Sequence, residues 1–242
     1  MNFITVCVIP ARYGSTRFPG KALADLNGKP IIRHVVERAR CVAGFDRILV
    51  ATDDDRIRKV VVGFGCEAVM TSSDLHSGTD RVAAALRGIS ADVVINLQGD
   101  EPMIDPSSVD RLVSLFHEDP TVEMGSLMCP IGDNETFEKP SVVKVVVDSH
   151  SNALYFSRAP IPYPRDGEFP DAYQHIGIYG FRRGMLEKFV SWPRGRLEET
   201  EKLEQLRALE HGVRIRMIEV PHVGVGIDTP EDLERVRRLL ST

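Results

Sequence analysis

A hydrophobic run near the start of the chain ends in a loop that carries three cations. The run covers residues 3–10, and the loop holds Arg12, Arg17 and Lys21 among glycines and small hydroxyl residues. Small residues leave backbone N–H groups open to a ligand, and the cations add positive charge, which is the chemistry that a triphosphate requires. The loop therefore predicts an enzyme that uses a nucleotide.

This loop differs from the phosphate-binding loop of P-loop NTPases. Five residues separate Gly14 from Gly20, where a Walker A motif has four, and Ala22 follows Lys21 where that motif has a magnesium-binding Ser or Thr. The spacing argues against a P-loop NTPase. An ordinary connection between a strand and a helix is the alternative reading of the loop.

Two aspartates stand at positions that suit a metal ion. Asp100 follows a strongly apolar run at residues 92–97, where open α/β sheets bind ligands, and Gly99 beside it permits close backbone approach. Asp228 precedes a helix start, but Thr229 already fits the N-cap. Because Mg²⁺ binds one or two carboxylates together with phosphate oxygens, we predict Asp100 and Asp228 as its ligands. A turn and a helix cap are the alternative roles.

A further segment has the features of an anion site at the start of a helix. Ser77, Gly78 and Thr79 open the helical pattern, and Arg81 lies in its first turn. Helix N-termini offer free N–H groups and a favourable dipole to anions. Ordinary helix capping is the alternative.

The elements that must position these residues alternate between strand and helix. Short apolar runs at 47–51, 67–70 and 92–97 alternate with helical patterns after residue 30, after residues 53–55 and at 79–88. This β-α-β-α-β order predicts an α/β fold with a single doubly wound, mostly parallel sheet.

The second half of the chain has a different pattern. Residues 142–147 are rich in β-branched side chains and are followed by a turn residue, Asn152, and a second run at 153–156, which predicts an antiparallel hairpin. Residues 199–211 predict one charged helix, and Thr229 begins the last helix. We expect one domain with an inserted mixed β region.

The composition of the chain argues against several classes of protein. The chain has 242 residues and a net charge of −5, and this acidic balance argues against a nucleic-acid binder. No run approaches the roughly 18 apolar residues of a membrane span, so we expect a cytoplasmic protein. The four cysteines are far apart, which favours reduced thiols over a zinc site or a disulfide framework.

Eight segments, in order along essentially the whole chain, resemble the CMP-Kdo synthetase family, the 3-deoxy-manno-octulosonate cytidylyltransferases. They are residues 9–21, 76–81, 98–102, 143–146, 155–162, 175–180, 201–207 and 226–233. The resemblance implies a Rossmann-like, GT-A-like nucleotidyltransferase that transfers CMP from CTP to Kdo with Mg²⁺ and releases pyrophosphate, which activates Kdo for lipopolysaccharide assembly. It also implies a cytoplasmic homodimer whose β-rich second half makes the dimer contact.

The resemblance assigns roles by position. It implies that the CTP phosphates are bound by Arg12, Ser15 and Lys21. It also implies that the cytosine and ribose are surrounded by Ala11, Thr71, Ser77, Gly78 and Arg81. It implies that magnesium is bound by Asp100 and Asp228, and that the Kdo pocket is lined by Gln98, Arg158, His175, Tyr179, Glu204 and Gln205. The residues expected to act in catalysis are Arg12, Lys21, Asp100 and Asp228. Within one domain, residues 1–130 would mainly bind CTP, about 131–220 would bind sugar and form the dimer, and 221–242 would supply the metal-ligand loop and last helix.

The sugar-site residues suit a polyhydroxylated acid, although each has an ordinary structural reading. Arg158 can pair with a carboxylate, and the other side chains offer mixed donors and acceptors. Tyr179 can instead belong to the core, His175 to the surface, and Glu204 and Gln205 to a solvated helix face.

Two rival functions remain at this stage. The first is the same chemistry on 8-amino-Kdo or another sugar acid, because one amino group changes few contacts. The second is a non-catalytic nucleotide-binding protein on the same fold. Loss of Lys21, Asp100 or Asp228 would favour the second rival, and all three residues are present.

Overall fold

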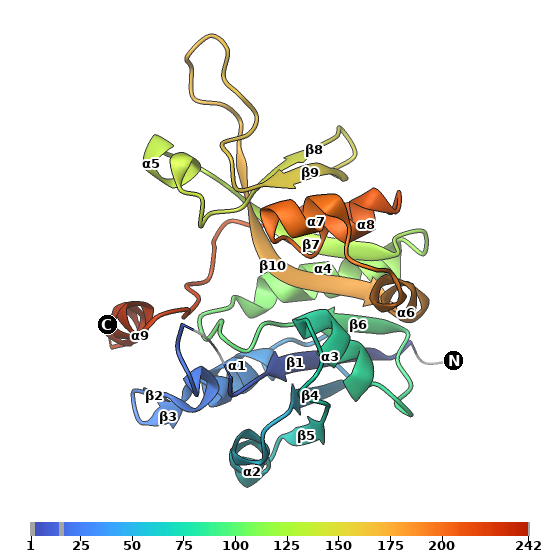
Figure 1. Cartoon of the computed structure of the whole chain (residues 1–242), viewed down its shortest axis with the longest axis vertical. Helices are drawn as coiled ribbons and strands as arrows, with labels where there is room; N and C mark the ends of the chain where they lie inside the picture. Colours follow the sequence, from blue (N-terminus) through green and yellow to red (C-terminus); the bar gives the residue numbers. More distant parts are fainter. Residues whose placement is uncertain (1–2, 15–16, 242) are drawn as a thin grey trace. The chain divides into compact units, whose positions relative to one another are not determined.

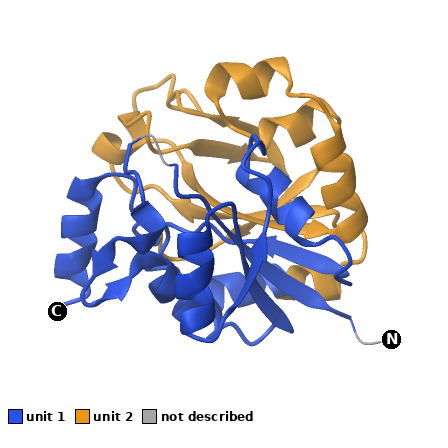
Figure 2. Cartoon of the chain, turned by 60° about the horizontal axis from the view of Figure 1, so that its bottom comes forward, with its two compact units in different colours: residues 1–113, 224–242 blue, residues 114–223 orange. Residues whose placement is uncertain are grey.

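The computed structural model describes residues 3–14 and 17–241 (Figure 1). The chain forms two compact units, which are coloured separately in Figure 2. Unit 1 comprises residues 1–113 and 224–242, and unit 2 comprises residues 114–223.

Unit 1 is built on parallel strands. The strands β1 (Thr5–Ala11), β4 (Arg47–Thr52), β5 (Glu67–Met70) and β6 (Val93–Asn96) pair in the order β6-β1-β4-β5, and each of these pairs is parallel. On β1, Val8 is opposite Leu49 of β4 and Asn96 of β6. Both neighbours of β1 are strands and its faces are covered, which explains why its sequence is apolar almost without interruption. The predicted α/β class and parallel sheet are confirmed.

Local sequence signals start the helices of unit 1. Asp54 caps α2 (Asp55–Gly63), Ser77 caps α3 (Gly78–Ala85), and Thr229 caps α9 (Pro230–Leu239) with a full capping box. Pro30 is the N-cap of α1 (Ile31–Ala39), which agrees with the helical pattern expected after residue 30. The remaining elements are η1 (Lys21–Leu23), β2 (Asp25–Leu26), β3 (Lys29–Pro30) and α4 (Pro106–Glu118), whose last residues belong to unit 2.

Unit 2 carries the mixed β region. Its strands are β7 (Met124–Pro130), β8 (Lys144–Val147), β9 (Ala153–Ser157), β10 (Tyr173–Arg182) and β11 (Ile215–Glu219). Strand β10 is antiparallel to β7 and β8, β8 is antiparallel to β9, and β11 is parallel to β7. The predicted β8–β9 hairpin is confirmed. Its helices are α5 (Asn134–Glu138), α6 (Arg183–Ser191), α7 (Arg196–Glu201) and α8 (Leu206–Glu210).

The prediction of one helix over 199–211 is wrong. Helix α7 ends where Lys202 adopts a left-handed conformation with a φ of 56°, and α8 begins at Leu206. A left-handed C-cap is usually Gly or Asn, so a lysine there gives no stop signal in the sequence. A buried ion pair joins the two helices: Arg207 donates to both carboxylate oxygens of Glu198, at 2.8 and 2.7 Å.

No helix in the described part of the chain has the length and apolar character that crossing a membrane demands.

Candidate active site

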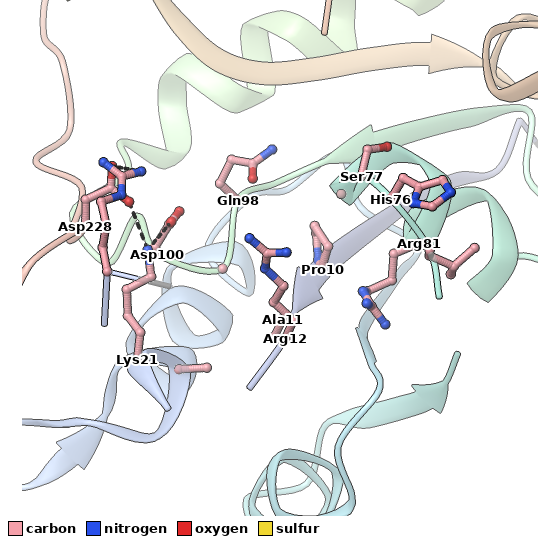
Figure 3. Close-up of a pocket in the computed structure, with 15 residues that line it drawn as sticks. Pro10, Ala11, Arg12, Lys21, His76, Ser77, Arg81, Gln98, Asp100 and Asp228 are labelled. Atoms are coloured by element: carbon pink, nitrogen blue, oxygen red, sulfur yellow. Dashed lines mark hydrogen bonds and ion pairs between the residues drawn. The ribbon is translucent and has the colours of Figure 1, made fainter. Parts of the chain in front are cut away.

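A cavity of about 290 Å³ opens in unit 1 beside the carboxyl ends of β1 and β6 (Figure 3). Its lining comes from the loop after β1, the start of α3, the loop after β6 and the segment before α9: Pro10, Ala11, Arg12, Arg17, Lys21, Ala22, Leu75, His76, Ser77, Gly78, Arg81, Gln98, Gly99, Asp100 and Asp228. This is the edge at which parallel α/β sheets bind ligands. The cavity therefore unites four segments that the sequence analysis singled out separately.

Lys21 joins the two predicted metal ligands. Its Nζ donates to Asp100 Oδ2 at 2.6 Å and to Asp228 Oδ1 at 3.1 Å, as the dashed lines of Figure 3 show. Arg17 Nη2 lies 3.2 Å from Asp228 Oδ2. The Lys21 side chain is largely buried at the start of the short helix η1, whereas about half of the Asp228 side chain is exposed. Residues far apart in the sequence thus form one charged cluster.

This cluster has donors that suit a hard divalent cation. Carboxylate oxygens are preferred ligands of such ions, which also take oxygens from a phosphate chain. Among the residues that the structure describes, no group of three or more His, Cys, Asp or Glu side chains gathers as a metal cage. Asp100 and Asp228 can therefore hold a cation only with help from a substrate or water.

Glu101 follows Asp100 and has a carboxyl group that is shielded from water. Burial, together with the charges of Asp100 and Asp228, raises the pKa of Glu101 to about 8. The uncharged form of Glu101 is favoured mainly because burial removes water from the carboxyl group, and the neighbouring carboxylates add to this effect. No role was predicted for Glu101, because a Glu beside an Asp carries no signal of this burial.

Gly99 is required by the backbone of the neighbouring strand. A Cβ at Gly99 would lie 2.7 Å from the carbonyl oxygen of Pro10, which is too close for any side chain. The missing Cβ therefore lets the loop after β6 pass against the end of β1. The prediction of a close backbone approach holds for Pro10.

Arg81 is held by a buried network rather than left free. Its Nη1 donates to Thr71 Oγ1 at 2.6 Å, and its Nη2 donates to Asp53 Oδ2 at 2.9 Å. The guanidinium is almost completely buried, although Arg81 also lines the cavity. Thr71 is not among the lining residues but is bonded to Arg81, which is. The role of Asp53 was missed because it stands in an aspartate run that reads as a helix start.

The other residues assigned to the nucleotide are placed as follows. Ala11 is buried at the end of β1, Arg12 is exposed, and both line the cavity together with Gln98 (Figure 3). Ser77 and Gly78 line the cavity at the start of α3, where the Ser77 side chain accepts from Asp80 N at 3.0 Å. Ser15 lies outside the described residues. His76 lines the cavity without an earlier assignment.

Unit 2 brings three of the predicted sugar-site residues together. Gln205 Nε2 lies 3.3 Å from His175 Nδ1, and Tyr179 Oη donates to Gln205 Oε1 at 3.0 Å. Because the Gln205 amide donates to Nδ1, the proton of a neutral His175 ring sits on Nε2, 2.9 Å from Ser126 Oγ. All four side chains are buried. His175 is therefore not a surface residue, and Gln205 is not solvated.

Burial keeps His175 uncharged. Desolvation lowers the pKa of His175 to about 3, so the ring is neutral across the physiological range. Ser126 was missed because a lone serine within an apolar strand carries no signal of its partner. Tyr179 is buried, as expected for a core residue, and its hydroxyl donates to Gln205.

Arg158 and Glu204 also belong to unit 2. Arg158 follows β9 directly and is half-buried, and its Nε donates to the main-chain oxygen of Glu201 at 2.9 Å. Glu204 lies in the turn between α7 and α8, with Oε1 3.9 Å from Arg207 Nη2. Glu204 is half-buried and lies beside Arg207, so its side chain is not fully solvated.

The parallel sheet and its charged cavity define a nucleotidyltransferase of the α/β class, and comparisons with known proteins agree. A family model described as Cytidylyltransferase matches residues 6–215. The chain is 49% identical to the 3-deoxy-manno-octulosonate cytidylyltransferase of Escherichia coli, over 98% of this chain and 96% of that protein. It belongs to the cytidylyltransferase family.

Two further proteins are similar to the chain over nearly its whole length. An 8-amino-3,8-dideoxy-manno-octulosonate cytidylyltransferase of Shewanella sp. (strain MR-4) is 48% identical, with 97% of each chain covered. A solved structure of CMP:2-keto-3-deoxy-manno-octonic acid synthetase complexed with CTP superposes with a TM-score of 0.95. Its sequence is 48% identical, and the match covers 98% of each chain.

Proposed function

We propose that this protein transfers CMP from CTP to the anomeric hydroxyl of 3-deoxy-manno-octulosonate (Kdo) and releases pyrophosphate. The observation that carries the proposal is the cluster of Lys21, Asp100 and Asp228 in one cavity at the carboxyl ends of parallel strands. Relatives named for this reaction match the chain over nearly its whole length, which supports the same substrates.

The nucleotide is proposed to bind in the cavity of unit 1. Arg12, Ser15 and Lys21 would hold the phosphates, which carry most of the negative charge of CTP. Ala11, Ser77, Gly78 and Arg81 would surround the base and ribose, with Thr71 acting through Arg81. The network around Arg81 supports this assignment, because it fixes the direction of the guanidinium before a ligand arrives.

Asp100 and Asp228 are proposed to hold Mg²⁺. When bound, this ion would neutralise charge on the α-phosphate and favour attack by the sugar hydroxyl. Lys21, which bridges the two carboxylates at 2.6 and 3.1 Å, would move its positive charge toward the leaving pyrophosphate. We propose direct in-line displacement, in which positioning and charge neutralisation lower the barrier and no protein group becomes covalently attached.

Recognition of the sugar acid is assigned mainly to unit 2. Arg158 would pair with the carboxylate of Kdo through a charge-assisted contact. His175, Tyr179, Glu204 and Gln205 would exchange hydrogen bonds with sugar hydroxyls, as would Gln98 from unit 1. The neutral state of His175 supports this role, since a neutral imidazole both donates and accepts.

The second candidate function uses the same chemistry on another sugar acid. Relatives that are 48% identical to the chain bear the name 8-amino-3,8-dideoxy-manno-octulosonate cytidylyltransferase, so 8-amino-Kdo is the specific rival. The two sugars differ at one substituent and share the carboxylate and the anomeric hydroxyl. The proposed roles of Arg158, Asp100 and Asp228 therefore apply to both.

We propose that the protein acts as one cytidylyltransferase domain in a cytoplasmic homodimer, supplying CMP-Kdo for lipopolysaccharide assembly. The family resemblance supports this assembly, with the dimer contact in the β-rich region of unit 2. Light scattering at micromolar concentration tests it: a mass of twice 26.9 kDa is expected, and a stable monomer would contradict it.

Pyrophosphate release from CTP and Mg²⁺ tests the function. Purified protein is given Kdo, 8-amino-Kdo or sialic acid, with UTP and ATP as nucleotide controls. Release with Kdo and CTP is expected, with much less from the other nucleotides. Preference for 8-amino-Kdo would retain the mechanism and change the substrate. No release with any sugar, from a folded protein that binds CTP, would support the non-catalytic rival.

A further inference from the structure

The chain holds Arg158 by nearly all of its polar groups. The main-chain N–H of Arg158 donates to Glu201 Oε2 at 2.9 Å, and its Nε donates to the main-chain oxygen of Glu201 at 2.9 Å. Its Nη1 donates to the carbonyl oxygen of Pro140 at 3.1 Å. Both the backbone and the guanidinium of Arg158 are therefore fixed by unit 2 itself.

Glu201 makes two different kinds of contact with this strand end. One carboxylate oxygen accepts from Arg158 N, and the other accepts from Ser157 Oγ at 2.6 Å. The main-chain oxygen of Glu201 is available for Arg158 Nε because Glu201 is the last residue of α7, where carbonyl groups lack partners within the helix. The left-handed turn at Lys202 ends the helix at this point.

Lys144 holds the carbonyl side of the same residue. It lies on β8 opposite Ser157 of β9 and is completely buried. Its Nζ donates to the carbonyl oxygens of Arg158 at 2.7 Å, Val142 at 2.6 Å and Lys139 at 2.9 Å. Glu201 and Lys144 thus fix the N–H and the C=O of Arg158 respectively.

This arrangement leaves one part of the guanidinium for a ligand. Within the described part of the chain, Nη2 of the half-buried Arg158 has no hydrogen-bond partner. A side chain whose Nε and Nη1 are already fixed loses little further freedom when Nη2 pairs with a carboxylate. The contacts therefore preorganise Arg158 for an acidic group.

We propose that Glu201 is a positioning residue, which acts through Arg158 to align its guanidinium with the carboxylate of the sugar acid. Lys144 is the second anchor of this positioning. The inference rests on the proposed function, because it deepens the role of Arg158 in that reaction. The ordinary alternative is that Glu201 only joins α7 to the end of β9.

The test is steady-state kinetics of Glu201→Gln beside Glu199→Gln. The glutamine keeps the size of the side chain but removes its negative charge, so Arg158 N and Ser157 Oγ both lose a charge-assisted acceptor. Glu199 is exposed on the same helix and undergoes the same chemical change. In Glu201→Gln, we expect the KM for Kdo to rise about tenfold and the KM for CTP to stay within about twofold. Glu199→Gln is expected to match the wild type.

Two kinetic results would overturn the proposal. An unchanged KM for Kdo in a folded Glu201→Gln variant would show that Arg158 does not need this anchor. Equal increases in the KM for Kdo and for CTP would show a general structural role instead.

A double variant separates positioning from stability. Because Glu201 is proposed to act through Arg158, Glu201→Gln in an Arg158→Lys background should change the KM for Kdo by less than about twofold. A full tenfold loss in that background would mean that Glu201 acts independently of Arg158, which contradicts the proposal.

A spectroscopic measurement keeps this inference separate from the proposed function. The signal of the Arg158 main-chain N–H, which donates to Glu201 Oε2, should be protected from solvent exchange in the wild type. It should exchange at least about tenfold faster in Glu201→Gln. If the wild type transfers CMP to no sugar acid, the proposed function fails. An Arg158 signal that exchanges equally in both proteins overturns the positioning itself.

Discussion

The charged cavity of unit 1 and the buried polar cluster of unit 2 differ in the charge and the exposure of their polar side chains. In unit 1, Lys21 lies between Asp100 and Asp228, with Arg17 beside them, and most of these side chains are partly exposed. In unit 2, His175, Tyr179, Gln205 and Ser126 are buried and neutral, and they bond to one another.

The difference follows from the cost of burying charge. Full burial of an ion carries a large desolvation penalty, so a site that must receive a triphosphate and a cation keeps its charges near water. Neutral groups can be buried when each has a partner, and the resulting network fixes their directions. Unit 1 is thus suited to balancing charge, whereas unit 2 is suited to recognising hydroxyl groups. The predictions below test this division.

The largest effect is expected from Asp100→Asn. Asparagine keeps the shape of the side chain but removes a negative charge from the proposed metal site, so kcat should fall by roughly 100-fold or more. The measurement is pyrophosphate release at saturating CTP and Kdo. Asp166→Asn, a change at an exposed aspartate, is the control and should have no effect. Near-normal turnover of a folded Asp100→Asn variant would remove Asp100 from the metal site.

Arg158→Ala is expected to separate the two substrates. Loss of a charge-assisted contact with the sugar carboxylate should raise the KM for Kdo about tenfold or more, with little change in the KM for CTP. Initial rates measured against each substrate in turn provide the comparison. Arg165→Ala, in the exposed loop after β9, serves as the control. If the KM for Kdo stays at the wild-type value, Arg158 does not bind the sugar acid.

Burial of neutral His175 should make the fold sensitive to acid. The pKa of His175 is lowered to about 3 in the folded protein, whereas an unfolded chain has a histidine pKa near 6.5. The unfolded state therefore binds the proton first, and this stability is present above about pH 6.5 and is lost as the pH falls toward 3. Each pH unit in this window should lower the free energy of unfolding by up to about 1.4 kcal/mol.

Urea denaturation between pH 7.5 and pH 5 measures this acid sensitivity. His175→Gln should show a flatter pH dependence than the wild type, while His222→Gln, at an exposed histidine, should retain the wild-type slope. Identical slopes in the wild type and in His175→Gln would contradict a buried neutral imidazole.

Tyr179→Phe removes a single hydroxyl group and should lower the stability of the fold. It deletes the hydroxyl that donates to Gln205 Oε1 and leaves a buried acceptor without that partner, which should cost about 1–3 kcal/mol of unfolding free energy. Chemical denaturation measures this change. Tyr163→Phe, at a strongly exposed tyrosine, provides the matched comparison. Unchanged stability would show that the hydroxyl is not part of the buried network.

Features with local sequence signals were predictable. The apolar run of β1, the caps Ser77 and Thr229, and the β8–β9 hairpin all depend on residues close in the chain. The sequence predicted Asp100 and Asp228 as partners in one metal site, whereas the contact of Lys21 with both carboxylates was not predicted.

Features that depend on tertiary packing were not predictable. The break at Lys202 has no Gly or Pro to mark it, so the charged pattern continued as one helix. The pairing of Asp53 with Arg81 joins the end of β4 to α3, and that of Ser126 with His175 joins β7 to β10. Such partners become visible only when the elements are packed together.

The ³¹P NMR spectrum of a reaction with CTP, Kdo and Mg²⁺ tests the central claim most directly. The account predicts that the three CTP signals give way to one phosphodiester signal from CMP-Kdo and a pyrophosphate signal in equal molar amounts. Persistence of CTP with folded protein, or its conversion to CDP and inorganic phosphate, would contradict CMP transfer to the sugar acid.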